Sequence, residues 1–165
     1  MSGLPPGYRL RSGSGLERSL LLKFMQRTYA EQEPRGNFDH LALTVDQYLS
    51  PETPLWWVES ELPVPGGLSP ASRRPNSIAC LWLGTAIDQS QGDRHAHIFL
   101  LYVAPEHRRK GIGSALMRHA ETWARKRGDR QIGLQVFESN QPALALYRGL
   151  GFRSQSLWLV KPLEK

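Results

Sequence analysis

The chain has 165 residues, 40% of them hydrophobic and 22% charged, and carries a net charge of +6. This is the composition of one globular domain, and it excludes wholesale disorder, a collagen-like chain and a coiled coil. The single cysteine, Cys80, excludes an internal disulfide and a zinc site built from several cysteines. Its apolar neighbours, Ile78–Trp82, favour a buried small side chain.

The start of the chain and its apolar stretches bear on the compartment. Residues 1–7 show neither the charged region nor the apolar region of a signal peptide. No apolar stretch approaches the roughly 18–20 residues that a membrane span needs. We therefore expect a cytoplasmic protein without a membrane partner.

The positive charge is concentrated in one segment. Between Pro105 and Arg130 there are eight Lys and Arg residues against three acids, and the rest of the chain is nearly neutral. Such a block indicates an anionic partner, either a phosphate ligand or a nucleic acid, and a solvated helix face is the plain alternative.

Hydrophobic periodicity predicts alternating strands and helices along the chain. We expect strands over residues 7–11, 55–59, 77–87, 97–103, 131–137 and 154–160. We expect helices over residues 16–30, 39–49, 111–127 and 141–150, the third of them ended by Gly128. Residues 62–76, rich in Pro, Gly and Ser, predict a long loop. The order predicts one α/β or α+β domain over residues 1–165.

A strand, a turn, a glycine-containing loop and a helix follow one another over residues 101–114. Amides at the start of a helix form an anion site, and Gly111 and Gly113 let the backbone approach a phosphate. The segment does not match a P-loop, because Lys110 precedes the glycines, and it lacks the third glycine of a dinucleotide fold.

Two ordered motifs give this loop a wider context. Arg108-x-x-Gly111-x-Gly113 follows an apolar strand, and residues 140–152 read N-x-x-A-x-x-L-Y-x-x-x-G-F. Together they resemble the GCN5-related N-acetyltransferase (GNAT) family. The resemblance implies a mixed, mostly antiparallel sheet of about six to seven strands with about four helices. It also implies a splay between the fourth and fifth strands, into which the pantetheine arm of acetyl-CoA inserts.

The resemblance also assigns residues to the cofactor. Backbone groups of Leu101, Tyr102 and Val103 would bind the pantetheine and the acetyl carbonyl. The implied pyrophosphate residues are Arg108, Arg109, Lys110, Gly111, Ile112, Gly113 and Ser114. Asn140 would contact the cofactor arm, although it is equally suited to cap a helix. Tyr147 would lie beside the sulfur and protonate the departing thiolate, and its alternative is a core aromatic.

The general base has no obvious candidate. The strand from His97 to Tyr102 contains no acid, and Gln135 stands where the ribosomal-protein N-terminal branch of the family has a Glu. The remaining candidates are Glu59, Glu61, Asp88, His95, His97 and Glu138. A water relay to a distant carboxylate is a further alternative.

The leading prediction is an enzyme that transfers the acetyl group of acetyl-CoA, its co-substrate, to a primary amine. The amine attacks directly in a ternary complex, without a covalent enzyme intermediate or a metal. The alternative is a catalytically weak acyl-CoA-binding sensor or partner module, and a nucleic-acid binder is less favoured. The first two helices and the loops at 62–76 and 88–94 would form the acceptor side. The acceptor itself, a small molecule or a peptide, stays open, as does a homodimer.

Overall fold

The computed structural model of the chain describes residues 3–63 and 76–164. The residues group into a first unit, residues 1–135, and a second unit, residues 136–165. Most of the long loop expected at 62–76 lies outside the described residues. Within the described ranges, no helix combines the length and the apolar character needed to cross a bilayer.

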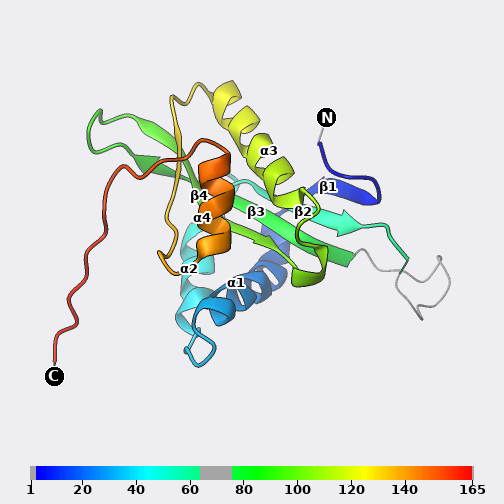
Figure 1. Cartoon of the computed structure of the whole chain (residues 1–165), viewed down its shortest axis with the longest axis horizontal. Helices are drawn as coiled ribbons and strands as arrows, with labels where there is room; N and C mark the ends of the chain where they lie inside the picture. The colour runs from blue at the N-terminus through cyan, green and yellow to red at the C-terminus, as the bar shows by residue number, and fades with distance from the viewer. Residues whose placement is uncertain (1–2, 64–75, 165) are drawn as a thin grey trace. The chain divides into compact units, whose positions relative to one another are not determined.

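The first unit is built on one mixed sheet of five strands in the order β1-β2-β3-β4-β5 (Figure 1). The strands are β1 Tyr8–Ser12, β2 Leu55–Ser60, β3 Asn76–Ile87, β4 Arg94–Val103 and β5 Ile132–Leu134. Neighbours are antiparallel except β4 and β5, which are parallel. The mixed, mostly antiparallel α/β fold is confirmed, whereas the expected count of six to seven strands is too high.

The helices of the first unit cover both faces of this sheet. They are α1 Arg18–Gln32, α2 His40–Tyr48 and α3 Ile112–Arg127. Successive side chains of a strand point to opposite faces, and two tryptophans of β2 show this. Trp57 packs on Phe24 of α1 at 5.2 Å between ring centroids, and Trp56 packs on His119 of α3 at 4.7 Å. Cys80, in β3 between these layers, is fully buried as expected.

Strand β4 changes register in its middle. Leu83 of β3 pairs with Ile98, and Trp82 pairs with Leu100, so Phe99 is an extra residue without a partner on β3. Such a bulge bends a strand and re-aims its side chains. The Phe99 ring lies over Gly84 of β3, where an added Cβ would stand 2.0 Å from its Cζ.

Beyond this bulge β4 stays paired with β3 but no longer pairs with β5. Strand β5 pairs with β4 only from Ala96 to Ile98, although β4 continues to Val103. Strand β5 is correspondingly shorter than the expected strand at residues 131–137. Among the described residues, the segment from Phe99 to Val103 therefore has no β5 partner, as a splayed pair of strands requires.

The second unit contains α4, Gln141–Gly149, and an extended terminal segment. The strand expected at residues 154–160 is wrong, because no strand pairing is present there among the described residues. Alternating apolar residues predict an extended shape, but a strand forms only where another backbone supplies hydrogen bonds. Trp158 in this segment is 81% exposed.

Candidate functional site

The segment between β4 and α3 has the geometry of an anion site. A 3₁₀ turn, Pro105–His107, leads into a loop with positive φ at Arg109 (62°) and Gly111 (83°). The amide of Ala115 donates to the carbonyl of Gly111 at 3.0 Å, and no side chain caps the N-terminus of α3. The preceding amides, from Ile112 to Ser114, are therefore free of the helix's own hydrogen bonds and meet the positive end of its dipole.

The side chain of Arg108, the first residue of the loop motif, is held by other parts of the protein. Its Nε donates to the carbonyl of Val103 at 2.7 Å, and its Nη2 donates to both carboxylate oxygens of Glu31 at 2.7 and 2.9 Å. Its guanidinium carbon lies 5.6 Å from the centre of the Tyr102 ring. The Arg108 side chain thus fastens the loop to β4 and to α1, and the loop offers a ligand its backbone amides.

A second contact holds the loop to β1. Lys110 Nζ donates to the Tyr8 hydroxyl at 3.4 Å, and this hydroxyl lies 2.8 Å from Nδ1 of His107. Burial, then the charge of Lys110, lowers the pKa of His107, so its neutral ring can accept the Tyr8 proton. Neither Tyr8 nor Glu31 could be assigned from the sequence, because nothing near them in the chain indicates a contact with a loop that lies about a hundred residues from Tyr8 and 77 residues from Glu31.

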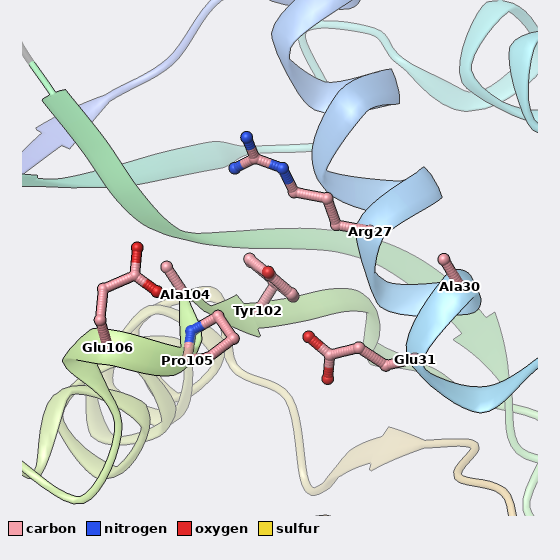
Figure 2. Close-up of a pocket in the computed structure, with 7 residues that line it drawn as sticks. All are labelled: Arg27, Ala30, Glu31, Tyr102, Ala104, Pro105 and Glu106. Atoms are coloured by element: carbon pink, nitrogen blue, oxygen red, sulfur yellow. The ribbon is translucent and has the colours of Figure 1, made fainter. Parts of the chain in front are cut away.

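A cavity of about 400 Å³ lies beside the end of β4. It is lined by Arg27, Ala30, Glu31, Tyr102, Ala104, Pro105 and Glu106. Figure 2 shows Glu31 reaching toward it from α1 and Glu106 lying on the opposite side, in the 3₁₀ turn. The cavity thus adjoins both the first helix and the anion site.

Two candidate bases are already engaged with other groups. Glu59 accepts from Arg9 Nη2 at 2.7 Å and from Arg11 Nε at 2.6 Å. Burial opposes its ionisation, but these two arginines prevail and hold the pKa of Glu59 below its ordinary value. Asp88 is buried, accepts from the amide of Ser90 at 2.8 Å and lies 3.3 Å from Arg130. None of the three side chains bonded to these carboxylates is part of the loop or of the splay.

The two histidines of β4 differ in their surroundings. His95 is buried, and its Nδ1 donates to the carbonyl of Ala96 at 2.9 Å. His97 is half-buried and lies where the pairing of β4 with β5 is about to end. Burial, then the nearby His95, lowers the pKa of His97, so the ring is neutral at pH 7. Of the remaining candidates, Glu61 pairs loosely with Arg9 at 3.8 Å, and Glu138 is exposed in the second unit.

Two candidate cofactor residues belong to the second unit. The Asn140 side chain accepts from the amide of Ala143 at 3.3 Å, so it caps α4. Tyr147 lies in the last turns of α4, its ring centroid 5.7 Å from that of Phe152. Burial raises the pKa of Tyr147, which keeps the hydroxyl protonated at neutral pH. The approach of these two residues to the loop stays a prediction.

Much of the basic segment is neutralised locally. Arg108 pairs with Glu31, and three more arginines make ion pairs with acids: Arg125 with Glu121, Arg127 with Asp129, and Arg130 with Asp93. Nearby acids therefore neutralise these four charges. This weakens the prediction of a nucleic-acid surface and leaves the loop before α3 as the candidate site for an anion.

Comparison with known proteins gives the fold a context. The model of the acetyltransferase (GNAT) family matches residues 23–152. Streptothricin acetyltransferase of Streptomyces lavendulae is 45% identical over 67 residues, which are 41% of this chain and 35% of that protein. The ribosomal protein bS18-alanine N-acetyltransferase of Escherichia coli strain K12 is 39% identical over 62 residues, 38% of this chain and 42% of that protein. The chain thus matches less than half the length of these curated relatives.

The fold also matches a solved structure along nearly the whole chain. A crystal structure of a predicted acetyltransferase from Clostridium acetobutylicum with acetyl-CoA superposes with a TM-score of 0.72. The match covers 94% of this chain and 96% of that chain, at 18% sequence identity. At this identity the likeness shows the fold.

Proposed function

Because the chain belongs to the acetyltransferase (GNAT) family, we propose that it transfers the acetyl group of acetyl-CoA to a primary amine. One observation carries this proposal: the part of β4 from Phe99 to Val103, which lacks a β5 partner, leads through a short turn and loop to the uncapped N-terminus of α3. Free backbone groups along a strand suit an extended arm with amide groups, and free amides at a helix start suit a diphosphate.

In this proposal the cofactor is bound mainly by backbone. Amides from Arg109 to Ser114 hold the pyrophosphate, and the exposed side chains of Arg109 and Lys110 add positive charge at its edge. Backbone groups of β4 at Leu101, Tyr102 and Val103 bind the pantetheine and polarise the thioester carbonyl. Arg108, held by Glu31, fixes the shape of the loop.

The chemical step is direct attack. The neutral amine forms a C–N bond with the thioester carbon, the C–S bond breaks, and the sulfur leaves as a thiolate. Tyr147 gives this thiolate a proton as general acid, and it regains a proton from the nitrogen, which loses one N–H proton as the amide forms. Asn140 contacts the cofactor arm. The enzyme accelerates the step largely by holding both reactants in one complex.

The acceptor is proposed only as a class. The two curated relatives are named for streptothricin and for the alanine of a ribosomal protein. Both names are consistent with an amine acceptor, either a small molecule or a peptide N-terminus.

The test combines binding with turnover. Acetyl-CoA and CoA should each raise the melting temperature, and ATP at the same concentration should raise it much less. Release of free thiol is then followed with a panel of small amines, lysine derivatives and peptides. Stabilisation with amine-dependent thiol release supports the enzyme. Stabilisation without release from any amine indicates the acyl-CoA sensor, and equal protection by ATP contradicts the cofactor site.

A further inference from the structure

We propose that His97 accepts the proton that the acceptor amine must lose before it attacks the thioester. The inference rests on the proposed function and deepens it, because it supplies the base for that reaction. An ammonium group cannot attack a carbonyl, and at neutral pH most primary amines are protonated. Some group near the reacting carbon therefore has to take this proton.

The position of His97 follows from the path of the cofactor arm. The phosphates are expected at the loop that follows β4, so the arm runs from there along the part of β4 without a β5 partner. That part, Phe99 to Val103, is five residues or roughly 16 Å long. Its far end is closed where Ile98 pairs with Leu134, and His97 is the neighbouring residue of the same strand. The reactive end of the arm is thus directed toward His97.

Both strand neighbours of His97 are glycines. His97 pairs with Gly84 of β3 and with Gly133 of β5, so no side chain from a paired residue stands beside its ring. A Cβ added at Gly133 would lie 3.8 Å from Nδ1 of His97 and 3.1 Å from Cε1 of His95. No Cβ at position 133 therefore stands against the Nδ1 edge of His97.

The ring also faces the side on which the acceptor is expected. The His97 ring centroid lies 5.9 Å from that of Phe99, and Phe99 in turn lies 5.5 Å from Tyr48 of α2. Tyr48 is 44% exposed, so this row of rings leads from the solvent toward His97. Helix α2 belongs to the part of the chain predicted to form the acceptor side.

The charges around His97 favour its neutral form. His95 is the titratable neighbour on β4, and it lowers the pKa of His97 further after burial. The paired residues on β3 and β5 are glycines, and α2 contributes the phenol of Tyr48 through Phe99. Within the described residues no hydrogen bond occupies either ring nitrogen of His97, in contrast to His95.

The proton balance of the step is complete. The ammonium N–H bond breaks and its proton moves to a ring nitrogen of His97, directly or through one water, which yields a neutral amine and an imidazolium. After acetyl transfer the imidazolium returns this proton to solvent. The net reaction converts an ammonium ion and acetyl-CoA into an amide, CoA and one proton.

The experiment compares His97→Gln with His119→Gln across a pH series. His119 is a matched control, because burial also lowers its pKa but it packs against Trp56 on the α3 face. We expect His97→Gln to reduce kcat at pH 7.5 on the order of 10²-fold, within the range of general base catalysis. Because the pKa of His97 is lowered, kcat/KM of the wild type should fall only at a pH below the ordinary histidine range, and this fall should be lost in His97→Gln. His119→Gln should keep both within twofold of the wild type.

Three further measurements distinguish a catalytic role of His97 from a folding defect. The acetyl-CoA affinity of His97→Gln, measured by calorimetry, should stay near the wild-type value. His97→Glu, which restores a proton acceptor, should recover part of the rate. The loss should also shrink with an amine that is already neutral at the assay pH.

The outcomes separate this inference from the proposed function. A folded His97→Gln that keeps turnover within twofold and an unchanged fall at low pH overturns the role of His97. So does the absence of any recovery in a folded His97→Glu. A wild-type protein that transfers no acetyl group to any amine instead refutes the proposed function.

Discussion

Replacing Gly84 by alanine tests the bulge that directs β4 toward the site. The added Cβ would stand 2.0 Å from Cζ of Phe99 and 2.2 Å from its Cε2, so the ring has to move. Its movement is restricted, because Trp82 and Tyr48 lie against it at centroid distances of 4.9 and 5.5 Å. Overpacking of this kind costs about 1–3 kcal/mol, and the loss of chain entropy in the unfolded state returns about 0.4–1 kcal/mol. We expect a net loss of about 1–2 kcal/mol.

A double-mutant cycle isolates this contact. The free energy of unfolding is measured in urea for Gly84→Ala, for Phe99→Ala and for the two combined. With the ring removed, alanine at 84 should be neutral or stabilising by up to about 1 kcal/mol. An equal loss from Gly84→Ala with and without the Phe99 ring would refute the reasoning, since the cost would then arise in the backbone.

Three further predictions concern the loop, the acid and the buried carboxylate. Gly113→Glu should abolish acetyl-CoA binding by calorimetry with an unchanged circular dichroism spectrum, because it places a side chain and a negative charge at the pyrophosphate amides. Tyr147→Phe should lower kcat on the order of 10²-fold with little change in the KM for acetyl-CoA, since only the proton donor is removed. In Glu59→Gln the free energy of unfolding should fall less steeply as the pH is lowered. The pKa of Glu59 is lower in the folded state than in the unfolded state, so the carboxylate stabilises the wild type above about pH 4.3, and this stabilisation is lost as the pH falls through the folded-state pKa.

Each of these predictions has a result that contradicts it. Unchanged affinity in Gly113→Glu removes the loop from the cofactor site. Turnover of Tyr147→Phe within twofold of wild type leaves the thiolate to take its proton from solvent. If the urea midpoints of wild type and Glu59→Gln fall by the same amount between pH 5 and 3, the ion pairs of Glu59 with Arg9 and Arg11 contribute nothing to the pH dependence of stability.

The parts of the fold that depend on local sequence were predictable. The periodicity of residues 111–127 predicts a helix, and α3 spans Ile112–Arg127 with Gly128 as its left-handed C-cap at φ 90°. Gly111, in the loop before this helix, adopts a positive φ, a conformation that favours glycine. The strand expected at 154–160 fails, because periodicity indicates an extended segment but not the backbone with which it pairs.

The parts that depend on distant contacts were not predictable. The bulge at Phe99 is a property of the register between two strands, and either strand read alone looks regular. The carboxylate that holds Arg108 comes from Glu31, 77 residues earlier in the chain. The loop motif therefore predicted where an anion binds but not which side chains keep the loop in shape.

The pair between Arg108 and Glu31 has a consequence for local opening of the chain. Glu31 lies in the last turn of α1, a helix that contributes no residue to the proposed phosphate contacts. Helix ends fray and exchange their amide hydrogens through such openings. A ligand that orders the loop keeps the Arg108 guanidinium in place, and so it also disfavours unwinding of this turn. Amide exchange at the end of α1 should therefore slow when the cofactor is bound, which would carry information about occupancy from the phosphate loop to the helix on the acceptor side.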